Sequence, residues 1–213
     1  PPAPPPRCAW IADPAKLGSK PGYPRPDLEH RLAHEGGFCF DRLEASDVAS
    51  GALAGYDVFV VPGGFAPNYE HALGPRGMCA IRTFVERGGG YVGICAGAYL
   101  GAELVPGAVE LVDSEHWRRG KSDACRLRLT DHGRELLAAG AVSEPSAAPE
   151  PAGVPDAFVS RYNNGPLLAV AGDTAWALAT FESQLRGTAE RRLRPVMRGT
   201  AAVAAAVPGR GRE

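Results

Sequence analysis

The first half of the chain alternates short apolar runs with amphipathic stretches, and glycine-rich turns separate them. Three apolar runs predict strands of the kind buried in a parallel sheet: 8–11, 38–40 and 57–61. Three other stretches carry caps or a one-sided apolar pattern and predict helices: 27–34, 46–53 and 75–87. Strand and helix therefore alternate, which predicts an α/β fold with a mostly parallel sheet flanked by helices.

The pattern changes after Gly101 to short apolar runs separated by turn residues such as Pro, Gly, Asn and Asp. Six strands are predicted in this half: 105–112, 125–130, 157–162, 167–170, 175–181 and 199–207. One helix is predicted over 131–139, with Asp131 as its N-cap. The fold is therefore expected to have a β-rich C-terminal half.

The length and net charge of the chain limit its domain count and the classes of partner it can have. The chain has 213 residues, a net charge of −1 and 45% hydrophobic residues, which suits one domain over 8–213 after a proline-rich lead-in at 1–7. A charge near neutral gives no reason to expect nucleic acid or an anionic membrane as a partner. No apolar run approaches the roughly 20 residues that span a bilayer. Oligomeric state stays open.

Five cysteines are present, and no pair has the spacing of a metal site: Cys8, Cys39, Cys79, Cys95 and Cys125. Their odd number indicates reduced thiols and predicts a cytoplasmic protein, with a removed export signal as the alternative. His30 and His34 share a predicted helix face, which we interpret as solvated. No metal and no cofactor is predicted.

Cys95 lies between Gly93 and Gly97 in the pattern G-x-C-x-G, where an apolar run ends and a helix is predicted to begin. This is the spacing of a nucleophile elbow, in which small neighbours let a strand turn sharply into a helix. The helix N-terminus would favour the thiolate. The alternative is a buried structural cysteine, because cysteine is often fully buried.

A second glycine turn, at Gly63 and Gly64, follows the predicted strand 57–61. In a parallel sheet the carboxyl ends of neighbouring strands meet, and ligands bind there. Gly63, Gly64 and the N–H of Ala96 are therefore predicted to form an oxyanion hole for a cysteine nucleophile. The alternative is that the two glycines only close a tight turn.

A cysteine nucleophile usually needs a histidine base, and two weak candidates follow Cys95. His116 lies in a polar stretch, and His132 follows Asp131 at a predicted helix start, where solvent exposure explains it equally well. A cysteine-variant α/β-hydrolase would use Asp123 and His132, but the stretch after Cys95 is too short for the strands that fold requires.

Three segments together resemble the class I glutamine amidotransferase-like superfamily: Val61–Gly64, Arg87–Tyr99 and Arg161–Pro166. More narrowly, they resemble the branch related to the N-terminal domain of biotin-protein ligase. The resemblance implies a flavodoxin-like sheet and a Cys-His-Glu triad with Cys95 as nucleophile. It also implies a small-molecule amide or acyl substrate, and places Tyr99, Asn163 and Asn164 in the substrate pocket.

The chain departs from that superfamily because no late His-x-Glu motif follows the last predicted strand before Glu213. We expect either a domain truncated at its C-terminus or a protein that works without the triad. Two hypotheses follow. The first is a cysteine-dependent amide or acyl hydrolase or transferase; the second is a non-catalytic small-molecule-binding or regulatory module of the same fold.

Overall fold

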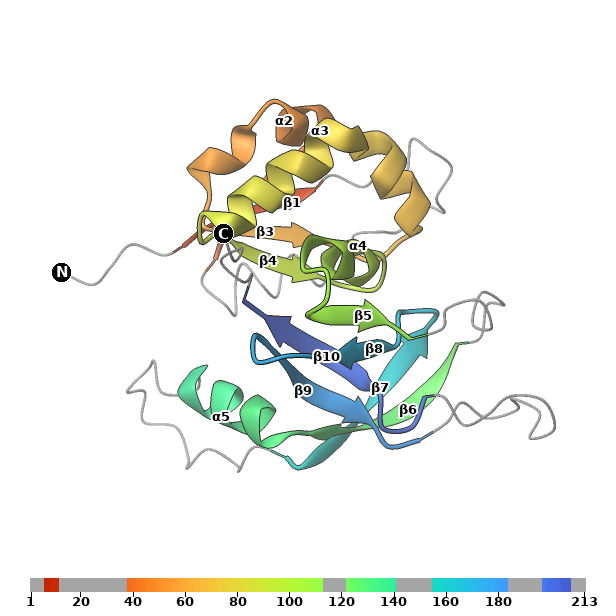
Figure 1. Ribbon diagram of the computed structural model, residues 1–213. Coiled ribbons are helices and arrows are strands. Elements are labelled where there is room, and N and C mark those ends of the chain that lie inside the picture. The colour runs from red at the N-terminus through yellow and green to blue at the C-terminus, as the bar shows by residue number, and fades with distance from the viewer. Residues whose placement is uncertain (1–5, 12–37, 113–121, 141–154, 184–196, 208–213) are drawn as a thin grey trace. The chain divides into compact units, whose positions relative to one another are not determined.

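The computed structural model describes residues 6–11, 38–112, 122–140, 155–183 and 197–207. They fall into two compact units, the first extending to Leu104 and the second running from Val105 to Gly209. Each unit is described by itself below, with the element labels of Figure 1.

The first unit is built on a four-stranded parallel sheet. Its strands are β1 (Arg7–Ile11), β2 (Cys39–Leu43), β3 (Val58–Val61) and β4 (Gly90–Gly93). They lie in the order β2-β1-β3-β4, and every pairing is parallel. This is how the first four strands of a flavodoxin-like sheet are ordered. The α/β class and the parallel sheet predicted from the sequence are confirmed.

Helices follow each of the later strands. They are α2 (Ala45–Ala49), the 3-10 turn η2 (Ala52–Gly55), α3 (Ala66–Glu86) and α4 (Ala96–Leu104). Helix α3 begins well before the predicted position. Gly74 (φ 58°) breaks its helical geometry, and the second part, which starts at Pro75, is the helix that the sequence predicted. Figure 1 shows α2 and α3 side by side. The helix predicted over 27–34 lies outside the described residues.

One apolar core joins these helices to a single face of the sheet. It contains Val48 of α2, Leu73 of α3 and Leu100 of α4. From the strands it takes the alternate positions Ile11, Phe59 and Val61, which point to the same side of the sheet. The core thus fixes α3 and α4 against β3 and β4, the two strands whose carboxyl ends carry the glycine turns.

The second unit is a six-stranded sheet in which every pairing is antiparallel. Its strands are β5 (Val109–Leu111), β6 (Ser122–Leu129), β7 (Ala157–Asn163), β8 (Leu168–Val170), β9 (Ala175–Phe181) and β10 (Ala201–Ala206). They lie in the order β5-β8-β10-β9-β6-β7. The predicted β-rich half is confirmed. No parallel strand follows Cys95 among the described residues, which argues against an α/β-hydrolase.

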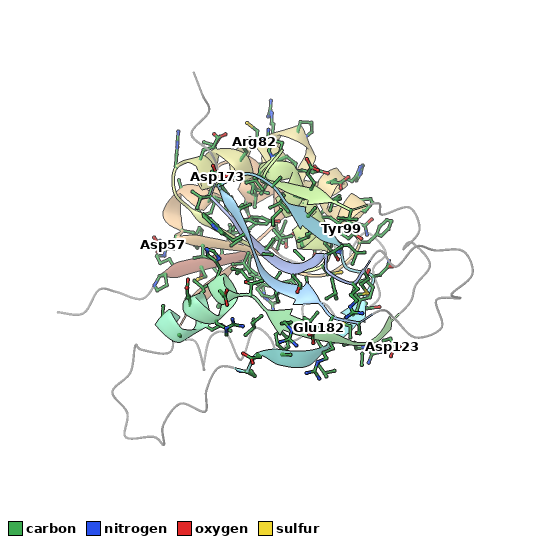
Figure 2. All side chains as sticks on the ribbon, turned by 60° about the horizontal axis from the view of Figure 1, so that its bottom comes forward. Asp57, Arg82, Tyr99, Asp123, Asp173 and Glu182 are labelled. Carbon is green, nitrogen blue, oxygen red and sulfur yellow. The ribbon has the colours of Figure 1, made fainter. Side chains whose placement is uncertain are left out.

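Helix α5 (Asp131–Gly140) packs on β9, and the residue that caps it was misassigned from the sequence. The Gly133 N–H donates to Thr130 Oγ1 at 3.1 Å, so Thr130 is the N-cap and Asp131 is the first helical residue. Directly after β9, Glu182 (labelled in Figure 2) accepts hydrogen bonds from Arg126 and Arg128 of the neighbouring strand β6. These bonds hold the pKa of Glu182 below its usual range.

Candidate functional site

Cys95 occupies the turn between β4 and α4 in a backbone conformation that is rare for its residue type. Its φ is 54°, in the left-handed region, where a side chain costs about 1–2 kcal/mol relative to ordinary conformations. The Cys95 carbonyl accepts hydrogen bonds from the N–H groups of Ala98 (3.0 Å) and Tyr99 (3.2 Å), so the helix begins at the cysteine. Strained backbone of this kind is concentrated at functional sites.

The two glycines that flank Cys95 are required by packing. A Cβ added at Gly93 would lie 2.3 Å from the Gly97 carbonyl oxygen. A Cβ added at Gly97 would lie 2.1 Å from the carbonyl oxygen of Val61 on β3. Both distances are far below a normal contact, and both neighbours are backbone. The G-x-C-x-G spacing therefore brings the strand, the turn and the helix against β3 more closely than side chains allow.

The glycine turn after β3 lies directly beside the cysteine turn. The Ile94 N–H donates to Val61 O at 2.9 Å, and the Gly97 N–H contacts Pro62 O at 3.3 Å. These two hydrogen bonds tie the turn that carries Cys95 to the start of the Pro62-Gly63-Gly64 turn. The carboxyl ends of β3 and β4 thus meet as the sequence indicates.

The Cys95 sulfur accepts hydrogen bonds from the backbone N–H groups of Gly64 and Ala96, which lower its pKa. Burial acts in the opposite direction and is the larger effect, so the pKa of the Cys95 thiol lies above its ordinary value. From the sequence, the helix N-terminus was expected to favour the thiolate. Without substrate, the desolvation of the half-buried sulfur raises the pKa by more than the stabilisation of the thiolate lowers it.

Two tyrosines that were not predicted as site residues donate hydrogen bonds to backbone carbonyls of these turns. The buried Tyr69 hydroxyl donates to Gly63 O at 3.3 Å, and the Tyr91 hydroxyl donates to Gly97 O at 2.7 Å. Burial raises the pKa of Tyr91 well above its usual value, so its hydroxyl keeps its proton. The available signal was a tyrosine within an apolar pattern near each glycine turn, since a buried hydroxyl needs a partner.

The other predicted site residues are distributed over both units. Tyr99 lies on α4 one turn after Cys95 and is half-buried (Figure 2). Asn163 ends β7, and Asn164 follows it with φ 60°. His132 is exposed on α5, with its ring 6.0 Å from the ring of Trp176. These residues of the second unit stay predictions as partners of Cys95.

His116, His30 and His34 lie outside the described residues. Among the cysteines whose side chains are described, Cys8 and Cys125 are buried, Cys79 is exposed, and none is in a disulfide. No cluster of three or more His, Cys, Asp or Glu side chains that could hold a metal occurs in the described parts of the chain. None of the helices described there is long and apolar enough to cross a bilayer.

A separate groove of about 650 Å³ opens at the other end of β3 and β4, where Asp57 and Gly89 precede these strands. It is lined mainly by the second part of α3, including Arg76, by Arg87 directly after that helix, and by η2. Cys95 is not part of it. The groove therefore contributes nothing to the chemistry of the two glycine turns.

The first unit is an α/β unit with a cysteine on a strand-to-helix turn, and comparison with known proteins finds a similarity over the segment that carries this turn. Residues 54–115 match the family described as biotin-protein ligase, N terminal. This segment contains both glycine turns and Cys95. The resemblance to the biotin-protein ligase N-terminal branch, which was predicted from the sequence, is confirmed.

Two further similarities are weaker in extent. A protein of Chlamydia muridarum (strain MoPn / Nigg), described as uncharacterized, is 48% identical over 44 residues, which is 21% of this chain and 17% of that protein. A crystal structure of a glutamine amidotransferase aligns over 81% of this chain and 79% of its own, with 18% identity and a TM-score of 0.45. A likeness at that level says nothing about catalytic residues.

Proposed function

We propose that the chain is a glutamine amidotransferase-like domain in which Cys95 is the nucleophile that attacks a small-molecule amide or ester. One observation carries the proposal. Two backbone N–H groups, from Gly64 after β3 and Ala96 at the start of α4, converge on the sulfur of a cysteine in strained backbone. We also propose that the first unit has the full flavodoxin-like fold and that the protein is cytoplasmic.

The chemistry is acyl transfer. Cys95 gives its proton to a base, and the thiolate attacks the carbonyl carbon, so that a C–S bond forms while the carbonyl π electrons move to oxygen. The oxygen then lies within reach of the N–H groups of Gly64 and Ala96, which stabilise its negative charge. When the intermediate collapses, the bond to the leaving group breaks and an amine or alcohol departs with the proton. The thioester passes its acyl group to water or to an amine.

Because the pKa of Cys95 is raised, this mechanism requires a general base. A thiol whose pKa lies above its ordinary value is almost fully protonated at neutral pH, so a base must accept its proton when the substrate binds. His116 and His132 are the histidines proposed for that role. The proposed oxyanion donors, the N–H groups of Gly64 and Ala96, need no such activation, because a backbone amide keeps its proton at neutral pH.

The same raised pKa favours the second candidate, a non-catalytic binding module. The N–H groups of Gly64 and Ala96 lie at the protonated thiol, and they can donate hydrogen bonds to a carbonyl or carboxylate oxygen of a small molecule without a covalent bond to sulfur. In that case the two turns form a recognition site, and the sulfur only fills space.

Acylation by p-nitrophenyl acetate and by γ-glutamyl p-nitroanilide, followed by mass spectrometry and peptide mapping, distinguishes the two. The matched reference is Cys79, which is exposed on α3. Burial and a raised pKa both disfavour reaction at Cys95, so faster acylation of Cys95 than of Cys79 requires stabilisation by the site. We expect Cys95 to be acylated faster, Cys95→Ala to lose that adduct and Cys79→Ser to keep it. Equal or slower acylation of Cys95 refutes the nucleophile and leaves the binding module.

A further inference from the structure

The Gly63–Gly64 peptide is the one part of the site that has glycine on both sides. Glycine crosses most of φ/ψ space at little cost, so a peptide between two glycines can turn over unless something holds it. The Gly64 N–H donates to Cys95 only in one of its orientations. A group that fixes this peptide therefore controls whether the site has one backbone donor or two.

Tyr69 is placed to do this. It lies in the first part of α3, five residues after Gly64, and only 1% of its surface is exposed. Its hydroxyl donates to Gly63 O at 3.3 Å. Its ring also covers the Gly64 Cα, because a Cβ added there would lie 3.0 Å from Tyr69 Cε2 and 3.4 Å from Tyr69 Oη.

Peptide geometry links the two ends of this contact. The carbonyl of Gly63 and the N–H of Gly64 belong to one planar unit, and in a trans peptide they point in opposite directions. A hydrogen bond to the carbonyl on one side therefore directs the N–H to the other side, where Cys95 lies.

We propose that Tyr69 is a positioning residue that holds the Gly63–Gly64 peptide with its N–H toward the Cys95 sulfur, and thereby keeps the oxyanion hole assembled. The inference rests on the proposed function for its catalytic consequence. Its structural part, the orientation of one peptide, stands without it. In this proposal Tyr69 acts on the sulfur through the peptide, by its hydrogen bond to Gly63 O.

Tyr91 supplies a matched control. It is also largely buried in the first unit, and its hydroxyl also donates to a glycine carbonyl, Gly97 O at 2.7 Å. The peptide it contacts lies on the far side of the cysteine turn and gives no N–H to the sulfur: its N–H, that of Ala98, donates to the Cys95 carbonyl at 3.0 Å. Tyr69→Phe and Tyr91→Phe thus each remove one buried hydroxyl, and only the first releases an oxyanion donor.

The test compares the full chain with Tyr69→Phe and Tyr91→Phe in three measurements. These are the pH midpoint of Cys95 alkylation by iodoacetamide, the rate of Cys95 acylation by p-nitrophenyl acetate, and the pH titration of the Gly64 amide proton in NMR spectra. We expect Tyr69→Phe to move the alkylation midpoint to higher pH, because the sulfur loses an N–H donor. We also expect it to slow acylation about tenfold, the effect of one ordinary hydrogen bond.

In the wild type and in Tyr91→Phe, the Gly64 amide should follow the titration of Cys95; in Tyr69→Phe it should not. An unchanged midpoint and an unchanged Gly64 titration in Tyr69→Phe would overturn the inference. A wild type that is alkylated at Cys95 but not acylated would refute the proposed function alone, because the midpoint and the amide titration still report the orientation of the peptide. If Tyr69→Phe does not fold, the wild type decides: a Gly64 amide that does not follow the titration of Cys95 would overturn the inference, because the N–H would then not point to the sulfur.

Discussion

The close contact between Gly97 and β3 predicts that Gly97→Ala destabilises the first unit. Two effects oppose each other. Alanine is the better helix former, which stabilises the variant by about 1 kcal/mol. The added Cβ, however, would lie 2.1 Å from the carbonyl oxygen of Val61 and 2.8 Å from its carbonyl carbon. These atoms belong to a central strand, so the helix start must move away by roughly 1 Å to restore a normal contact.

The magnitude follows from what that movement costs. Overpacking in a core costs about 1–3 kcal/mol. The displacement also weakens the hydrogen bonds from Ile94 N–H to Val61 O (2.9 Å) and from Gly97 N–H to Pro62 O (3.3 Å), each worth about 0.5–1.5 kcal/mol. After subtraction of the gain in helix propensity, the free energy of unfolding should fall by about 2 kcal/mol.

Urea unfolding followed by the fluorescence of Trp10, which is fully buried in the parallel sheet, measures this change. The chain has three tryptophans, so Trp117→Phe and Trp176→Phe are introduced first to leave Trp10 as the single reporter. The control is Gly55→Ala, where the nearest atom to the new Cβ is an Arg7 side-chain nitrogen at 3.7 Å. If Gly97→Ala unfolds within about 0.5 kcal/mol of this control, the steric argument for the cysteine turn is wrong.

Two further predictions concern the second unit. The pKa of Glu182 is lowered by its two arginine partners, so the stability this residue contributes is present above the unfolded pKa of about 4.3 and is lost as the pH falls through the lower folded value. Glu182→Gln should therefore reduce the difference between the urea midpoints at neutral and acid pH. Thr130→Ala should lower the free energy of unfolding by about 1 kcal/mol through loss of the cap to Gly133, and Thr130→Ser should restore most of it, in thermal unfolding followed by circular dichroism.

The sequence predicted the parts of the fold that depend on local periodicity. The apolar run 57–61 became β3 (Val58–Val61), and the run before Cys95 became β4. The glycines around Cys95 were predictive because their spacing reflects a steric requirement within a few residues of the chain. The same holds for the change after Gly101, where turn residues at short intervals indicate antiparallel strands.

The parts that could not be predicted depend on contacts between distant residues. Burial sets the pKa direction of Cys95, and no pattern near the cysteine reports how much of the sulfur is covered. The partner of Tyr69 could not be found either, because its hydroxyl bonds to a backbone carbonyl, which every residue carries. Thr130 was overlooked because Asp131 is an equally good capping residue, and only the backbone geometry distinguishes them.

The left-handed backbone at Cys95 favours glycine, so a cysteine at this position is kept at a cost in stability. Glycine adopts φ 54° without penalty, so a lineage with no use for the sulfur would gain about 1–2 kcal/mol of backbone stability by a single replacement. If related sequences keep this cysteine, the thiol is still needed. If they carry glycine here, the need for the thiol has been lost.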